Sequence, residues 1–126
     1  MSFSNTYETI VLQWTFTNTS VTRPTAWYVA LFTSDPGEAS GGTELSGNGY
    51  ARQSVAFTVT NDLATNSAAI EFPVATANWG TITHVAVTDA LSGGNHIAYA
   101  ALTTAKAIDT GDILRIPAGD LDITLN

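Results

Sequence analysis

The sequence contains no cysteine among its 126 residues. Without cysteine there can be no disulfide framework, no thiolate metal site and no thiol nucleophile. Basic residues are also scarce, because four lysines and arginines stand against eleven acidic residues and give a net charge of −7. Phosphate binding needs clustered basic side chains, so this balance argues against a nucleic-acid partner.

Long apolar runs are missing as well. No segment reaches the roughly 18 consecutive apolar residues that span a membrane. Met1 is followed by Ser-Phe-Ser-Asn, not by basic residues and an apolar stretch. The sequence therefore predicts neither a signal peptide nor a membrane partner.

The residues that are present suffice to build a folded core. Hydrophobic residues make up 44% of the chain and aromatic residues 10%, so disorder is not expected. The length is that of one ordinary domain. We therefore expect residues 1–126 to form a single domain that buries about two-thirds of its unfolded surface.

The N-terminal segment carries the signals of a helix. Ser4 is a suitable N-cap, and Glu8 follows in the first turn, where a carboxylate is favoured. An apolar stripe with helical spacing then appears at Tyr7, Ile10, Val11 and Trp14. Residues 14–17 favour a strand by propensity, but we predict a helix of about three turns over residues 5–14.

After a connector that Pro24 closes, the pattern becomes that of strands. The expected strands are 26–33, 50–60, 68–72, 81–88, 96–102, 113–117 and 121–125. Between them lie a long glycine-rich loop, a turn, a corner and a hairpin loop, expected at 34–49, 61–66, 75–80 and 89–95. Such evenly spaced short strands predict a mainly β fold, an antiparallel β-sandwich or jelly roll with one short N-terminal helix.

Few residues suggest catalysis or metal binding. His84 is best explained as a half-buried, hydrogen-bonded strand residue, and His96 has no ligand-like neighbour. The acidic residues near the C-terminus lack a calcium-loop pattern and suit turns: Asp109, Asp112, Asp120 and Asp122. No nucleophile elbow or phosphate loop is present. The sequence predicts no catalytic residues, no metal and no cofactor.

The three tryptophans could in principle stack on sugars. We expect them to serve the core instead, because each lies in an apolar context. Trp79, beside Gly80 at a corner, is the one expected to be exposed.

Several segments together resemble a family of small tailed-phage virion proteins, which carry the names capsid decoration (cement) protein or phage tail fibre protein. The resembling segments are 4–8, 27–36, 49–52, 66–73, 79–84, 93–95, 101–104, 111–112, 116–119 and the alternating end 121–125. They cover nearly the whole chain in order. The resemblance implies a β-sandwich or jelly-roll module preceded by a helix, built into a virion and without catalysis. Residues 15–23 depart from it in being unusually rich in threonine.

Three functions follow as hypotheses. The first is a capsid decoration protein, a homotrimer that binds and stabilises the shell of major capsid protein after assembly in the bacterial cytoplasm. The second is a tail, baseplate or fibre component that contacts host glycans. The third is an unrelated secreted sugar-binding or hydrolytic domain. Small size and the lack of a repetitive shaft favour the first hypothesis over the second.

The 34–49 loop is the expected partner-binding element. Its glycines leave much conformational freedom when the loop is free, and Leu45 is its one large apolar side chain. We expect Asp35, Glu38 and Glu44 to face a basic surface on a neighbouring protein. As catalytic acids, these carboxylates would be held too loosely. The alternative is that the loop is a solvated connector.

Overall fold

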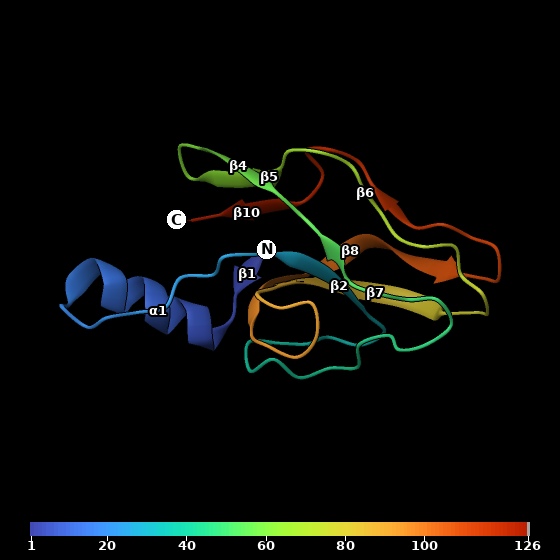
Figure 1. Ribbon diagram of the computed structural model, residues 1–126, viewed down its shortest axis with the longest axis horizontal. Helices are drawn as coiled ribbons and strands as arrows, with labels where there is room; N and C mark the ends of the chain where they lie inside the picture. Colours follow the sequence, from blue (N-terminus) through green and yellow to red (C-terminus); the bar gives the residue numbers. More distant parts are fainter. Residues whose placement is uncertain (126) are drawn as a thin grey trace.

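The structure is a computed structural model in which residues 1–125 are described (Figure 1). It contains one helix, α1 (Asn5–Phe16). The strands are β1 (Ser2–Phe3), β2 (Tyr28–Phe32), β3 (Gln53–Ser54), β4 (Phe57–Thr60), β5 (Leu63–Asn66), β6 (Ile70–Glu71), β7 (Gly80–Thr88), β8 (His96–Ile108), β9 (Arg115–Ile116) and β10 (Asp122–Thr124).

The strands form three antiparallel sheets. The largest has the order β1-β8-β7-β2-β3, and the smaller ones have the orders β10-β5-β4 and β6-β9. In Figure 1 the β10-β5-β4 sheet lies above the five-stranded sheet, and α1 extends to one side. The predicted class is thus confirmed: the fold is mainly β, with antiparallel sheets and one N-terminal helix. The sandwich or jelly-roll topology remains a prediction.

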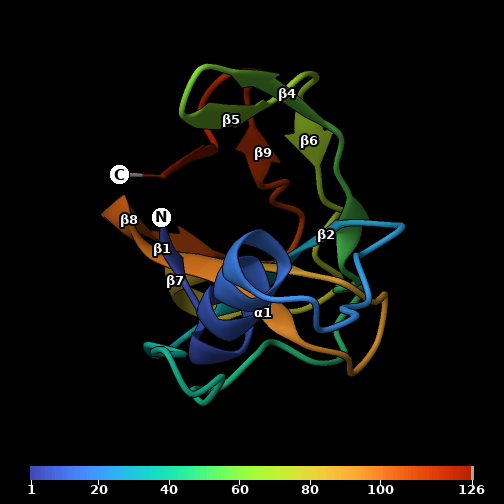
Figure 2. The same cartoon turned by 90° about the vertical axis from the view of Figure 1, so that its left-hand side faces the viewer.

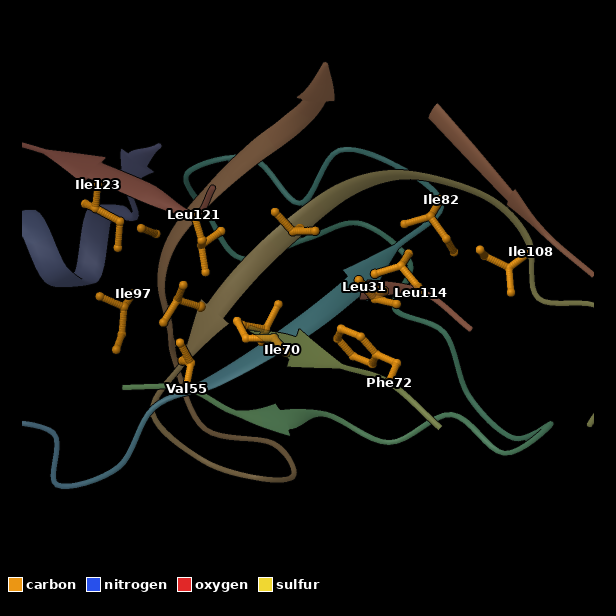
Figure 3. Close-up of a cluster of buried hydrophobic side chains, with 14 of the residues drawn as sticks. Leu31, Val55, Ile70, Phe72, Ile82, Ile97, Ile108, Leu114, Leu121 and Ile123 are labelled. Atoms are coloured by element: carbon orange, nitrogen blue, oxygen red, sulfur yellow. The ribbon is translucent and has the colours of Figure 1, made fainter. Parts of the chain in front are cut away.

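The core lies between the sheets (Figure 3). Its largest fully buried apolar side chains come from β2, β7 and the segment after β6: Leu31, Phe32, Phe72, Ile82, Val29 and Val87. Strand β2 is buried on both faces, since Val29 and Leu31 join the main cluster whereas Ala30 and Phe32 pack with Ala86 on the other side. The unbroken apolar pattern of the sequence had indicated this double burial.

The predicted N-terminal helix is confirmed, and it is two residues longer than expected. The Ser4 side chain accepts a hydrogen bond from the Tyr7 N–H and so caps the first turn. Ser4 is itself fully buried, and its N–H donates a hydrogen bond to the carbonyl of Ile97 in β8. The helix continues to Phe16, past the last position that reaches the body of the protein.

Two expected boundaries were wrong. The predicted strand 50–60 is divided, because β3 pairs with β2 whereas β4 pairs with β5 in another sheet. The predicted turn 61–66 consists only of the two residues Asn61 and Asp62, with Asn61 at φ 55°, and β5 follows at once. Asparagine tolerates this left-handed conformation better than most residues, which makes the tight turn possible.

The remaining strands agree in position and differ in length. β7 matches its prediction closely, whereas β8 runs six residues past the expected end at 102 to pair again with the start of β7. The predicted strands at 68–72, 113–117 and 121–125 are shorter in the structure. β1 was not expected, because two residues carry no readable pattern.

Candidate protein-interaction surfaces

The 34–49 loop is more ordered than its glycine content suggests. Its end continues the sheet beside β2, where Glu44 forms a bridge with Phe32 and the Leu45 N–H donates to the carbonyl of Leu31 at 3.0 Å. The side chain of Leu45 packs against the main core. Residues 44–45 are therefore part of the folded structure, and Leu45 is not free for a partner.

The two other acidic residues of the loop point elsewhere. Asp35 is exposed, and its carboxylate accepts a hydrogen bond from the Gly37 N–H at 2.8 Å. The Glu38 side chain is exposed as well, whereas its carbonyl accepts the N–H of Asn5 at the start of α1. Of the four predicted contact residues, only Asp35 and Glu38 present side chains that a neighbouring protein could reach freely.

Glu44 forms an ion pair with Arg52. The Arg52 Nη2 and Nε atoms lie 2.7 and 2.9 Å from the two carboxylate oxygens, a bidentate geometry. The Arg52 side chain is buried, and that of Glu44 is mostly buried. The Tyr50 hydroxyl donates a third hydrogen bond to the same carboxylate at 2.6 Å.

The third guanidinium nitrogen of Arg52, Nη1, binds the 89–95 loop. Arg52 Nη1 donates to the carbonyls of Ala90 and Gly93 at 2.7 and 2.8 Å, and to the Thr88 hydroxyl at 3.2 Å. Both carbonyls belong to the hairpin loop between β7 and β8. One guanidinium thus joins the 34–49 loop to the 89–95 loop, which are far apart in the sequence.

These contacts change the ionisation of the carboxylate. Burial alone would raise the pKa of Glu44, but hydrogen bonds from Arg52 and Tyr50 outweigh it and lower this pKa below its ordinary value of 4.5. The charged form is therefore the one that the fold stabilises. We assign Glu44 to the interior of the protein, which removes it from the predicted partner surface.

His96 lies beside this ion pair without joining it. The imidazole packs edge-on against Phe32 at 5.2 Å between ring centroids, and its Nδ1 atom is buried without a hydrogen-bond partner. Burial, together with the charge of Arg52, lowers the pKa of His96 below its ordinary value of 6.5. The neutral imidazole is the form that fits the fold.

A pH dependence of stability follows. Because the unfolded chain binds a proton at His96 more readily than the folded chain, the free energy of unfolding should fall as the pH drops below 6.5. The slope contributed by one such group reaches at most about 1.4 kcal/mol per pH unit. Urea unfolding between pH 7 and pH 5 should show this slope in the wild type and a weaker one in His96→Gln. An unchanged slope in His96→Gln would contradict the assignment.

The other residues considered for chemistry have structural roles. His84 is half-buried, as expected, with its Nδ1 atom 2.8 Å from the Thr83 hydroxyl. The Asp112 carboxylate accepts the N–H of Asp109 within a turn, which is the use predicted for these aspartates. Within residues 1–125 no group of three or more histidines and acidic residues is placed to hold a metal ion. No helix in this range is long and apolar enough to cross a membrane.

The expectation was wrong for all three tryptophans. Trp79, expected to be exposed, is only 5% exposed, and its indole N–H donates to the carbonyl of Asn48 at 2.8 Å. Trp14 and Trp27, both expected in the core, are 74% and 38% exposed. For Trp14 the reason is that α1 extends away from the body of the protein (Figure 1), so the stripe that begins at buried Tyr7 ends in solvent.

Sequence reasoning did not single out Arg52, although a signal was available. It is one of only four basic residues in the chain, and it stands in a segment of alternating apolar residues. An arginine in such a context needs a buried acidic partner. Glu44 lies eight residues earlier and was the natural candidate.

The molecule is therefore a small antiparallel β protein whose exposed apolar helix and acidic loop offer surfaces for other proteins, as structural components of virions do. Its sequence matches, over residues 2–124, the model of a family described as podophage GP4 fiber I protein gp80. The chain belongs to this family and is a phage virion structural protein. No curated protein matches it.

Proposed function

We propose that this chain is a structural component of a phage tail fibre and acts by binding other virion proteins, without catalysis. The observation that carries the proposal is the family match, which spans nearly the whole chain and describes a fibre protein. It supports the fibre hypothesis better than the capsid decoration hypothesis that small size had favoured. A small β module needs no shaft of its own if it joins a larger fibre.

The exposed acidic side chains are the proposed contacts with a neighbouring virion protein. Asp35 and Glu38 both lie on the 34–49 loop near the start of α1. In a chain of net charge −7 they favour a basic partner surface. Charges at the rim of an interface mainly guide encounter and specificity. Apolar surfaces must then supply most of the affinity.

The copy number and the cross-links in purified virions test this proposal. A fibre component should be present in far fewer copies than the major capsid protein, whereas a decoration protein should approach its copy number. Quantitative mass spectrometry measures this ratio. Carboxyl-to-lysine cross-linking should join Asp35 or Glu38 to a tail protein, with the exposed acids Asp62 and Glu71 as internal controls. A copy number close to that of the major capsid protein, with cross-links to it, would overturn the fibre assignment.

A further inference from the structure

The last turns of α1 expose an uncharged, apolar helix end. Leu12, Trp14 and Phe16 are 57%, 74% and 77% exposed. Leu12 and Phe16 are four residues apart and share one face of the helix, whereas Trp14 points to nearly the opposite side. No charged residue occurs between Glu8 and Arg23. A helix that is apolar on opposite faces is normally buried between two surfaces.

An open apolar groove lies on the same molecule. It has a volume of about 360 Å³, and all the residues that line it are apolar: Phe3, Trp27, Phe57, Val59, Ala64, Val87, Ile97 and Ile123. One wall comes from β1, β7, β8 and Trp27, the residue before β2, and the other from the β10-β5-β4 sheet. A neighbouring hollow of about 340 Å³ shares four of these residues and continues toward exposed Leu125.

The helix can be compared with the strands that line the groove in Figure 2, in which α1 points toward the viewer below the β4-β5 layer. None of the residues that line the groove belongs to α1. The helix end therefore does not fill the groove of its own chain.

We propose that the end of α1 from one copy of the chain docks in this groove of a second copy. The groove has two apolar walls, one for Trp14 and the other for Leu12 with Phe16 on the opposite side of the helix. The charges match. Two copies that each carry a charge of −7 repel one another and can associate only through uncharged surfaces, and these two surfaces are uncharged.

Other occupants fit the groove less well. A glycan needs hydrogen-bonding groups around its aromatic platform, and the side chains of the groove offer none beyond the indole of Trp27. The size suits a protein contact. Aromatic side chains bury about 150–250 Å² each, so both helix aromatics and the facing groove would bury on the order of 1,000 Å², the lower limit of a specific interface.

The contact joins two different surfaces, and a contact of this kind gives a ring of identical copies when its rotation closes. We expect three copies, the homotrimer that the resemblance to tailed-phage virion proteins implies. Docking would also cover Val59, which is 71% exposed on β4, and shield the edges of the short strands beside it. The inference concerns only the chain itself and does not depend on where the protein sits in the virion.

Light scattering on the purified chain is the first test. The wild type should have a mass that is a multiple of 13.2 kDa at about 100 µM, where a contact with a Kd of about 1 µM is nearly saturated. The variant Trp14→Ser/Phe16→Ser should shift to the monomer mass. The control Val74→Ser/Leu91→Ser, which alters two exposed apolar residues elsewhere, should keep the wild-type mass. Circular dichroism should show that all three proteins fold.

Cysteine cross-linking identifies the contact itself, because the chain has no cysteine of its own. Oxidised Phe16→Cys/Val59→Cys should run as covalent multimers on a non-reducing gel, whereas Phe16→Cys/Leu91→Cys should not. A monomeric wild type would overturn the proposal. So would a disulfide formed within one chain, or multimers that survive the Trp14→Ser/Phe16→Ser change.

Discussion

Replacing Arg52 with methionine should lower the free energy of unfolding by about 3 kcal/mol, the lower end for a buried ion pair, because it leaves the mostly buried Glu44 carboxylate without its partner. The Arg52→Met variant also removes the side-chain donor to the carbonyl of Gly93 and one of the two donors to the carbonyl of Ala90, which keeps the Thr88 hydroxyl. The loss of these hydrogen bonds adds to the cost. Urea unfolding at pH 7 measures the difference.

Two controls separate the ion pair from a general effect of the substitution. Arg115→Met removes an exposed arginine and should change the free energy of unfolding by less than about 0.5 kcal/mol. The double variant Arg52→Met/Glu44→Met should regain part of the loss, since no unpaired buried charge remains. If Arg52→Met costs less than about 1 kcal/mol, the ion pair does not stabilise the fold as proposed.

The tryptophans give the second large effect. Trp79→Ala should cost about 3–5 kcal/mol of unfolding free energy, because it empties a buried site and removes the hydrogen bond to Asn48. It also removes the edge-on contact with Tyr50, whose ring centroid lies 5.7 Å away. Trp14→Ala removes a side chain of equal size from solvent and serves as the matched comparison.

Trp14→Ala should change the free energy of unfolding by less than about 0.5 kcal/mol. Both variants should be measured in dilute protein, where a second copy makes no contribution to stability. Thermal melting followed by circular dichroism gives an independent reading. Equal losses for the two variants would contradict the burial of Trp79 and the exposure of Trp14 in the structure.

The helix and the longest strand pair could be predicted because their signals are local. Ser4 and Glu8 mark the start of α1, and the alternation in 81–88 marks β7. The end of α1 was harder to predict, since the apolar stripe at Trp14 looks the same whether a core or a second protein covers it. The spacing of apolar residues shows which face of a helix is apolar, but it does not show whether the core or another protein covers that face.

The candidate site illustrates a different limit. Glu44 was predicted to face a partner because acidic residues in glycine-rich loops are usually solvated, and its charge suited that role. Its actual partner, Arg52, follows the loop in the same chain, and only the folded backbone brings the two within 2.7 Å. Asp35 and Glu38 stay at the surface, although the His84 Nε2 atom lies 3.9 Å from the Asp35 carboxylate. Sequence reasoning could not divide the acids of this loop between interior and surface.

The pairing of the first strand has a consequence for the order of folding. β1 is held by β8, with Ser2 opposite Tyr99, and the start of α1 is anchored to the same strand through Ser4 and Ile97. Residues 2–4 therefore find their partners only in residues 97–99, more than ninety positions later in the chain. Contacts of such long sequence separation slow folding. Strand β2 in turn pairs along its whole length with β7, about fifty residues later, and until β7 is present this apolar strand is exposed to aggregation.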